Sequence, residues 1–258
     1  MEPVPARVIA IAAGRPAKLV WTNELGGTTY ELGAATNRSF VKWSARGSSI
    51  NLERERERLT WASAFVVVPR VLEHGDDETG SWLVTEALSG TNAVDPRWLA
   101  APAVAVGAIG AGLRAFHDAL PVAACPFSWS MDDRIADIRE RAARCAIDPS
   151  RWHPDHRRLT LDRALELLAE PPPIDRLVVC HGDTCAPNTL LDDAGRFAGH
   201  VDLGALGVAD RWADLAIATW STQWNYGPGW ETALLAAYGV TPDEARMRYY
   251  RLLWDLGP

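Results

Sequence analysis

A short polar segment of the sequence has residue types and a spacing that suit phosphoryl transfer. It follows an apolar stretch, and it reads His181-Gly182-Asp183-Thr184-Cys185-Ala186-Pro187-Asn188. Phosphoryl transfer requires a carboxylate that receives the proton of the accepting hydroxyl, hard oxygen ligands for Mg²⁺, and a cation that orients the phosphates. Asp183 is therefore our candidate for the catalytic base. Asn188 and the downstream Asp202 are our candidates for the Mg²⁺ ligands.

Each of these residues, taken alone, has an ordinary interpretation. A single Asp or His in a loop is most often a turn residue. The complete pattern is far more specific, because His-Gly-Asp is followed by Asn188 and then by a later Asp-Leu-Gly that begins at Asp202. We expect His181 to brace the loop and Asp183 to carry the chemistry.

Lys42 is the candidate cation for the α- and β-phosphates. It lies in a predicted strand, and a charged helix with several glutamates follows it. An ion pair with one of these glutamates would fix the lysine side chain. A lone lysine in a strand is usually a solvated edge residue, however, and Glu53, Glu55 and Glu57 alternate with arginines as on a solvated helix face. The spacing alone leaves the choice of glutamate open.

The elements that must position these residues change in kind along the chain. The first third is β-rich, with Gly26-Gly27 as the turn of a hairpin, and the rest has mainly helical periodicity. The predicted strands span 20–23, 28–32, 39–43, 66–72, 81–86, 177–180, 189–191 and 198–201. The predicted helices span 51–64, 102–119, 131–146, 159–169, 212–220, 230–238 and 241–253.

This order of elements predicts an α+β protein with two lobes. The N-terminal lobe, residues 1–86, would be a small antiparallel β-sheet with one key helix. The C-terminal lobe, residues 87–258, would be larger and mainly helical. We expect any ligand site to lie in the cleft between the lobes.

The composition excludes several classes of protein. The chain has 258 residues, 48% of them hydrophobic, which suffices for a sizeable core. Its net charge of −7 is unlike the basic footprint of a nucleic-acid-binding protein. We predict no signal peptide and no membrane-spanning stretch. The four cysteines form no C-x-x-C pair and no zinc pattern, so we expect reduced thiols in a cytoplasmic protein.

With these features in place, the sequence resembles the aminoglycoside phosphotransferases, whose fold is similar to that of protein kinases. The resemblance covers nearly the whole chain. It is closest to the branches that act on the 3'-hydroxyl of kanamycin-like drugs and on streptomycin. The strongest matches are 179–188 and 201–216, and the segments 55–61, 125–127 and 249–253 are also similar.

The resemblance implies a role for each candidate residue, with ATP and Mg²⁺ as cofactors. Asp183 matches the catalytic base, Asn188 and Asp202 match the magnesium ligands, and Lys42 and Glu55 match the phosphate-binding lysine and its partner. The further residues implied to bind the nucleotide are Gly27 and Thr28 in the loop over the phosphates, and Thr85, Glu86 and Ala87 in the hinge beside adenine. Asp210 and Asp214 are expected to hold the catalytic loop rather than to react.

The acceptor site is where the sequence departs from the family. Relatives that bind polycationic aminoglycosides line this site with acids, which fits ion pairing with ammonium groups. The acids that this chain keeps there are Asp148, Asp155 and Asp255. Four tryptophans are candidates for an aromatic wall that stacks on the acceptor: Trp220, Trp224, Trp230 and Trp254. The alternative is that these tryptophans are core residues, because tryptophan is highly buried on average.

Three functions follow from these observations. The first is an ATP-dependent O-phosphotransferase that acts on a hydroxyl of an aminoglycoside. The second is a kinase of the same fold that acts on another small molecule, as the acid-poor acceptor site suggests. The third is a nucleotide-binding pseudokinase, but all four residues whose loss would indicate one are present. We expect a nucleotide and a small hydroxyl acceptor as partners, no nucleic acid or membrane, and a monomer or weak homodimer.

Overall fold

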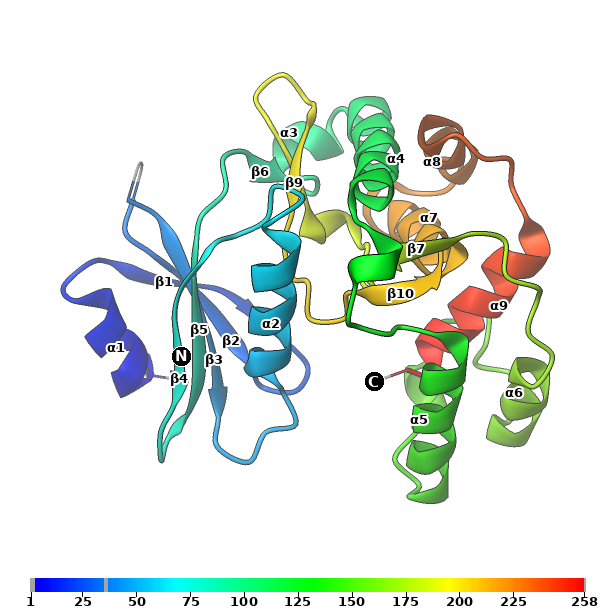
Figure 1. The fold of residues 1–258 in the computed structure, drawn as a ribbon, viewed down its shortest axis with the longest axis horizontal. Helices are drawn as coiled ribbons and strands as arrows, with labels where there is room; N and C mark the ends of the chain where they lie inside the picture. The colour runs from blue at the N-terminus through cyan, green and yellow to red at the C-terminus, as the bar shows by residue number, and fades with distance from the viewer. Residues whose placement is uncertain (1–2, 35–36, 258) are drawn as a thin grey trace. The chain divides into compact units, whose positions relative to one another are not determined.

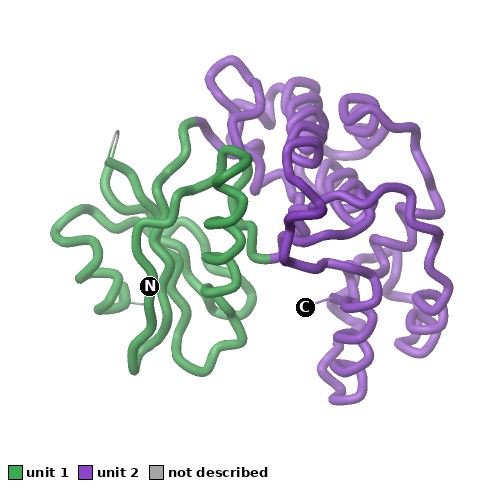
Figure 2. Tube along the Cα trace, viewed as in Figure 1, with its two compact units in different colours: residues 1–89, 200–204 green, residues 90–199, 205–258 purple. Residues whose placement is uncertain are grey.

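The computed structural model describes residues 3–34 and 37–257 of the chain. The chain divides into two compact units, one of residues 1–89 and 200–204 and the other of residues 90–199 and 205–258 (Figure 2). The segment 200–204 carries Asp202 and groups with the N-terminal unit, although it lies far beyond the boundary placed at residue 87 from the sequence. Within this unit Asp202 forms an ion pair with Lys42.

The N-terminal unit is built on a five-stranded antiparallel sheet with a helix on each face (Figure 1). The strand order is β1-β2-β3-β5-β4. The strands are β1 (Ala17–Thr22), β2 (Thr28–Leu32), β3 (Ser39–Ala45), β4 (Val71–Asp76) and β5 (Gly80–Glu86), and the helices are α1 (Ala6–Ala12) and α2 (Leu52–Ala62). Val8 and Ala12 of α1 pack on Tyr30, Leu32 and Val41. Helix α2 packs against β4 and β5.

Two local features place the charged residues of this unit. Helix α2 begins after Asn51, whose side chain accepts a hydrogen bond from the backbone N–H of Arg54. This cap satisfies a free donor of the first turn, and the acids of that turn suit the positive end of the helix dipole. In β3, Lys42 pairs with Thr29 on one side and Leu83 on the other. Strand alternation puts Phe40 and Lys42 on the same face.

The C-terminal unit is mainly helical in the part that the structure describes. Its helices are α3 (Pro96–Leu99), α4 (Pro102–Ala119), α5 (Met131–Ala143), α6 (Leu161–Leu168), α7 (Trp212–Tyr226), α8 (Glu231–Tyr238) and α9 (Glu244–Asp255). Strand β7 (Leu177–Cys180) pairs with β10 (Gly207–Asp210), and β8 (Thr189–Leu191) lies between β6 (Thr91–Asn92) and β9 (Phe197–His200). Three short 3₁₀ turns span Val122–Ala124, Pro149–Arg151 and Ala186–Asn188.

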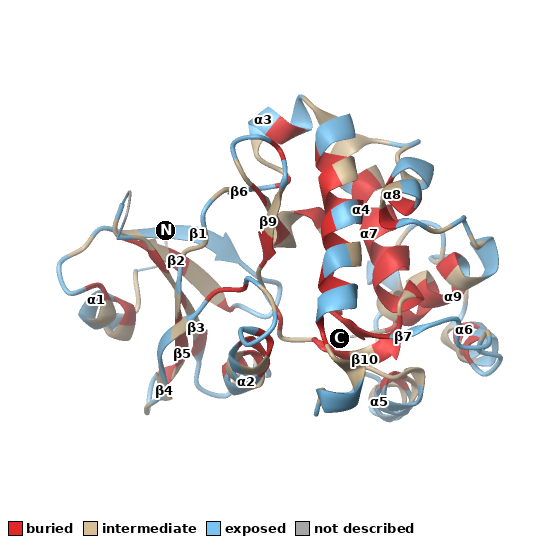
Figure 3. Ribbon diagram, turned by 45° about the horizontal axis from the view of Figure 1, so that its top comes forward, coloured by how far each residue is buried: buried red, intermediate tan, exposed pale blue. Residues whose placement is uncertain are grey.

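The core of this unit is formed around α4 and α7. Helix α7 is buried from Trp212 through Thr222, and its visible part is largely red in Figure 3. Helix α4 packs on α8, and α7 packs on α9. Pro102 stands in the first turn of α4, where the missing N–H has no partner to lose. Among the described residues, no helix combines the length and the apolar character needed to cross a bilayer.

The α+β architecture predicted from the sequence is confirmed, with differences in detail. The strand predicted over 66–72 begins only at Val71, because Pro69 lacks the N–H that a strand ladder needs. Helix α7 runs past its predicted end at residue 220 and stops at Gly227, whose φ of 85° ends the helix. Among the described α-helices and strands, those that the sequence did not predict are α1, α3, β6 and β10, all of them short, and the three 3₁₀ turns were not predicted either.

Candidate active site

The loop after β7 carries the predicted base. The buried strand ends at Cys180, and the chain then turns through Gly182, whose φ is 87°. A Cβ atom at this position would lie 2.5 Å from the backbone oxygen of Ala205. Only glycine satisfies both the left-handed backbone and this close approach. The turn therefore sets the direction in which Asp183 leaves the strand.

Asp183 and Asn188 are in direct contact. The Nδ2 of Asn188 donates to both the backbone oxygen and the Oδ2 of Asp183, each at 3.0 Å. The Oδ1 of Asp183 is buried and has no hydrogen-bond partner among the described residues. A buried acceptor without a donor is costly. One carboxylate oxygen is thus held in place while the other is available to a hydroxyl donor.

Asp214 of α7 holds the backbone of this loop. It is fully buried, and it accepts hydrogen bonds from the backbone N–H groups of His181 at 2.7 Å and Gly182 at 2.9 Å. The Nε2 of His117 lies 3.0 Å from the same carboxylate. Burial alone would raise the pKa of Asp214, but the hydrogen bond and charge of His117, with further help from the Gly182 N–H, lower it below its ordinary value. The carboxylate of Asp214 is therefore ionised, which suits its expected role of holding the catalytic loop.

His117 and Tyr238 extend this network, and neither was predicted from the sequence. The Nδ1 of His117 lies 2.8 Å from the hydroxyl of Tyr238, whose pKa burial raises to about 12. Because an ionised carboxylate only accepts, the Nε2 of His117 carries a proton towards Asp214. A histidine on the buried face of the apolar helix α4 was the available signal. It did not reveal the partners, which lie 97 and 121 residues away.

The Sγ of Cys180 lies close enough to His117 and Asp214 for the three to resemble a metal site. Burial raises the pKa of the Cys180 thiol and so disfavours its thiolate. Metal ligation requires the thiolate. The hydrogen bonds of His117 and Asp214 account for this group without a metal.

Asp210 has a different role from the one expected. Its carboxylate accepts from the backbone N–H groups of Trp212 at 2.9 Å and Asp175 at 2.6 Å. These contacts fix the start of α7 and the segment before β7. Asp210 therefore supports the strand that leads into the catalytic loop and does not hold the loop itself.

The N-terminal unit brings Lys42, Glu55 and Asp202 together. The Nζ of Lys42 lies 2.8 Å from both carboxylate oxygens of Glu55 and 2.8 Å from an oxygen of Asp202. Burial opposes the lysine charge, but the two carboxylates more than offset it and raise the pKa of Lys42. The structure therefore selects Glu55 from the three alternating glutamates. The contact of Lys42 with Asp202 was not predicted.

The three members of this charged cluster differ in exposure. The side chain of Glu55 is only 8% exposed, and burial raises its pKa despite the counteracting charge of Lys42. That of Asp202 is 48% exposed. Asp202 also has a φ of 66°, a left-handed conformation that is uncommon outside glycine and occurs at functional sites. A half-exposed carboxylate in a defined backbone conformation suits a hard cation.

The predicted phosphate loop is a tight turn between β1 and β2. The side chain of Asn23 accepts a hydrogen bond from the backbone N–H of Gly27 at 2.8 Å. A Cβ at Gly27 would lie 2.5 Å from the Cδ1 of Ile50, so the loop packs closely here. The hydroxyl of Thr28 is buried without a hydrogen-bond partner in the described part of the chain. It is thus a donor available to a ligand.

The predicted hinge has some of its backbone donors already in use. The N–H of Glu86 donates to the backbone oxygen of Arg70 at 2.9 Å, and that of Ala87 donates to Arg38 at 3.3 Å. The second bond is long and therefore weaker. Thr85 pairs with Phe40, an aromatic residue on the Lys42 face that the sequence reasoning missed. The alternation of Phe40 and Lys42 in β3 was the signal that could have found it.

The predicted acceptor residues lie in the C-terminal unit in different settings. Asp148 is exposed and caps a 3₁₀ turn through the N–H of Ser150, and Asp155 is exposed near His153. Asp255 is nearly buried and hydrogen-bonded. Trp224 is exposed and Trp220 is fully buried, so Trp220 lies beneath the surface. The three acids therefore differ in their exposure and in their hydrogen bonding.

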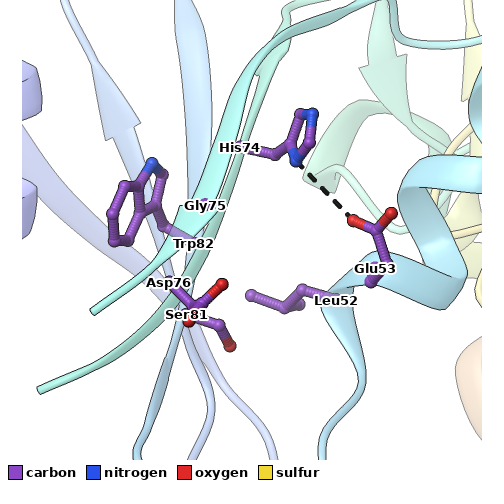
Figure 4. A pocket seen from close by; sticks show the side chains of 7 residues that line it. All are labelled: Leu52, Glu53, His74, Gly75, Asp76, Ser81 and Trp82. Carbon is purple, nitrogen blue, oxygen red and sulfur yellow. Dashed lines mark ion pairs between the residues drawn. The ribbon is translucent and has the colours of Figure 1, made fainter. Parts of the chain in front are cut away.

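A separate hollow of 160 Å³ lies beside the start of α2 (Figure 4). Its lining residues are Leu52, Glu53, His74, Gly75, Asp76, Ser81 and Trp82. The exposed His74 and Glu53 face one another at 3.6 Å, a surface pair of little energetic value. None of the predicted site residues lines this hollow, so it has no part in the site described above.

The sequence matches one family pattern and several named relatives. The pattern of the phosphotransferase enzyme family matches residues 23–250. The chain is 38% identical to an aminoglycoside 3'-phosphotransferase of Streptomyces fradiae over 215 residues, which is 80% of each protein. It is 34% identical to the streptomycin 3''-kinase of Streptomyces griseus over 246 residues, which is 90% of this chain and 88% of that kinase.

Solved structures agree with these sequence relatives. An aminoglycoside 3'-phosphotransferase of type VIII superposes with a TM-score of 0.81 at 32% identity, covering 96% of this chain and 97% of that one. An aminoglycoside phosphotransferase of Streptomyces rimosus in complex with ADP and streptomycin superposes with a TM-score of 0.77 at 28% identity. It covers 97% of this chain and 96% of its own.

Proposed function

The chain belongs to the aminoglycoside phosphotransferase family, and we propose that it transfers the γ-phosphoryl group of ATP to a hydroxyl of an aminoglycoside. The observation that carries this proposal is the loop around Asp183. Its Oδ2 is held by Asn188, while its buried Oδ1 has no partner among the described residues. The hydroxyl of an acceptor can donate the hydrogen bond that this oxygen does not receive from the described residues.

This geometry supports the following reaction. The hydroxyl donates its hydrogen bond to the Oδ1 of Asp183, and the proton passes to that oxygen as transfer proceeds. The hydroxyl oxygen bonds to the γ-phosphorus while the bond from that phosphorus to the bridging oxygen breaks, and ADP leaves. Asn188 and Asp214 keep the carboxylate and its loop in one orientation. Positioning of this kind supplies much of the rate.

The nucleotide is bound by residues of the N-terminal unit. Lys42 orients the α- and β-phosphates, and Glu55 fixes the lysine by two hydrogen bonds. Gly27 and Thr28 cover the phosphates, and the Thr28 hydroxyl is a free donor for them. Thr85, Glu86 and Ala87 would lie beside the adenine base. The long bond from Ala87 to Arg38 is the one that the base displaces most easily.

Asn188 and Asp202 are the proposed ligands of Mg²⁺. The amide and carboxylate oxygens they offer are of the hard type that this ion prefers. The Nδ2 of Asn188 is used by Asp183, and its Oδ1 accepts no hydrogen bond among the described residues. The ion would neutralise charge on the phosphates. Asp202 stays close to its position in the absence of ligand because Lys42 holds it.

The same proposal extends to location and assembly. Cys125, Cys145, Cys180 and Cys185 are free thiols, as expected of a protein in a reducing compartment. We therefore assign it to the cytoplasm, where ATP is available. For its assembly we propose a monomer or a weak homodimer. Size-exclusion chromatography with light scattering at several concentrations tests the assembly state.

A panel of acceptors tests the function directly. The protein is incubated with ATP, Mg²⁺ and either kanamycin A, streptomycin or unrelated alcohols, and the products are analysed by mass spectrometry. We expect a product that carries one additional phosphoryl group with at least one aminoglycoside, and fragmentation then locates it. Turnover of an unrelated alcohol alone would favour the second candidate, a kinase of the same fold, which the engaged state of Asp255 supports.

A further inference from the structure

An aromatic cluster fills the part of the C-terminal unit where acceptor residues were predicted. We define the tryptophan cluster as His153, Trp220, Trp224 and Trp254. The ring centroid of Trp220 lies 4.2 Å from that of His153 and 5.4 Å from that of Trp224. Trp224 and Trp254 are 5.7 Å apart. The rings in these three contacts are tilted, and Trp220 and Trp254 meet edge to face at 6.3 Å. Both arrangements are favourable for aromatic pairs.

The cluster has a buried base and an open surface. Trp220 is fully buried, whereas Trp224 is 42% exposed. The guanidinium of Arg251 lies 5.4 Å from the ring of Trp220. The indole Nε1 of Trp220 is buried and has no hydrogen-bond partner among the described residues. A phenylalanine would fill a purely structural position without that unmet donor.

Asp255 supports this cluster from behind. Its Oδ2 accepts from the Nδ1 of His156 at 2.5 Å and from the backbone N–H of His153 at 3.0 Å. The Asp255 side chain is only 6% exposed. A carboxylate that is buried and already bonded twice is poorly placed to form an ion pair with a substrate ammonium group. It does fix the segment on which the His153 ring stands.

Helix α7 connects the tryptophan cluster to the catalytic loop. The hydroxyl of Ser221 accepts a hydrogen bond from the backbone N–H of Ala186 at 2.8 Å, within the loop that carries Asp183. Trp220 precedes Ser221, and Trp224 lies one turn further on the same face as Trp220. One rigid helix therefore holds both the catalytic loop and the aromatic surface. Trp220 and Trp224 therefore lie within one helical turn of a residue that contacts the catalytic loop.

We propose that Trp224, together with Trp254 and His153, binds the acceptor by stacking on the face of one of its rings, and that Asp255 positions this surface without pairing with the acceptor. The proposal rests on the proposed function, since it names how that acceptor is recognised. Stacking of a ring on indole depends on buried area and on the attraction of the aromatic face for attached cationic groups. It is less sensitive to salt than a rim of exposed ion pairs.

Acceptor binding, measured without ATP, separates stacking from ion pairing. Isothermal titration with kanamycin A and with streptomycin is carried out on the wild type, W224A, W224F and D255N. Trp21→Ala is the control, because Trp21 is an exposed tryptophan in β1 of the other unit. We expect W224A to weaken the better-bound acceptor by about tenfold, W224F to recover most of the loss, and D255N and W21A to stay within about twofold.

D255N is an informative variant because an asparagine oxygen can still accept both of the hydrogen bonds that Asp255 receives. A tenfold or greater loss in D255N with unchanged binding in W224A would overturn the proposal and assign recognition to the carboxylate. Equal losses in W224A and W21A would also overturn it. Because the readout is binding, it stands even if the panel of acceptors yields no phosphorylated product, in which case the proposed function alone fails.

Discussion

The charged cluster of the N-terminal unit and the catalytic loop of the C-terminal unit are held by different means. Lys42 is fixed by two side-chain carboxylates, and one of them, Asp202, is half-exposed. The loop is fixed by the buried Asp214, which bonds backbone N–H groups. Ion pairs between side chains leave charge available for a ligand. Backbone hydrogen bonds to a buried carboxylate use that charge to fix geometry.

This contrast ranks the consequences of losing each charge. Removing Lys42 leaves Glu55 and Asp202 without their shared cation and leaves the phosphates without a positive partner. We expect Lys42→Met to lower kcat/KM by about 10²- to 10³-fold. Steady-state kinetics with varied ATP measures this. Lys18→Met, an exposed lysine in β1, is the matched control and should change kcat/KM by less than about twofold.

Asp214 should affect the rate without affecting nucleotide affinity. Asp214→Asn weakens the acceptor for His181 and Gly182, so the loop loses its fixed orientation. We expect kcat to fall on the order of 10²-fold while the affinity for ATP stays within about threefold. Kinetics and titration of ATP on the same preparation distinguish the two. A large loss of ATP affinity with normal kcat would contradict the division between the two regions.

Two glutamates on one helix test the charged cluster more finely. Glu55 is buried against Lys42, whereas Glu53 is exposed and pairs with Arg56. Glu55→Gln should lower kcat/KM by about tenfold, because it removes a charge-assisted hydrogen bond. Glu53→Gln should change neither the activation free energy of the reaction nor the free energy of unfolding by more than about 0.5 kcal/mol. Equal effects of both substitutions would show that the general charge of α2 matters and not the specific pair.

We expect the smallest effect in the way the free energy of unfolding depends on acid pH. The pKa of Asp214 lies below its ordinary value of 3.8, so the unfolded chain binds its proton more readily than the native protein. The stability from this group is fully present above pH 3.8 and is lost as the pH falls through the lowered pKa. Urea unfolding of wild type and Asp214→Asn at pH 6 and pH 3 should therefore show a gap that narrows in acid. A gap that widens in acid would be inconsistent with an ionised Asp214.

The sequence could predict the features that depend on local patterns of residues. Hydrophobic periodicity placed most helices and strands, because burial of one face has a period that single residues reveal. The motif gave Asp183 and Asn188, which are close in sequence and proved to be in contact. Glu55 needed the family resemblance, since three alternating glutamates were equivalent by spacing. Short elements such as α3 and β10 had too few residues to show a period.

Contacts between distant segments were beyond the reach of the sequence. The pair of Lys42 with Asp202 depends on a left-handed turn far along the chain. The network of His117, Asp214 and Tyr238 joins three helices, and no local pattern specifies it. Asp255 has the residue type expected of an acid that binds the acceptor, but its carboxylate is already hydrogen-bonded to His156. Residue type and spacing predicted candidates, and tertiary hydrogen bonding decided their roles.

The central claim is that Asp183 receives the proton of the acceptor hydroxyl. Asp183→Asn keeps the shape of the side chain and removes its basicity. We expect phosphoryl transfer to an aminoglycoside to fall by about 10³-fold or more while ATP binding stays within about twofold. Asp193→Asn, at an exposed turn of the β8–β9 hairpin, serves as the control. Near-wild-type transfer by Asp183→Asn would contradict the assignment of this residue as the base.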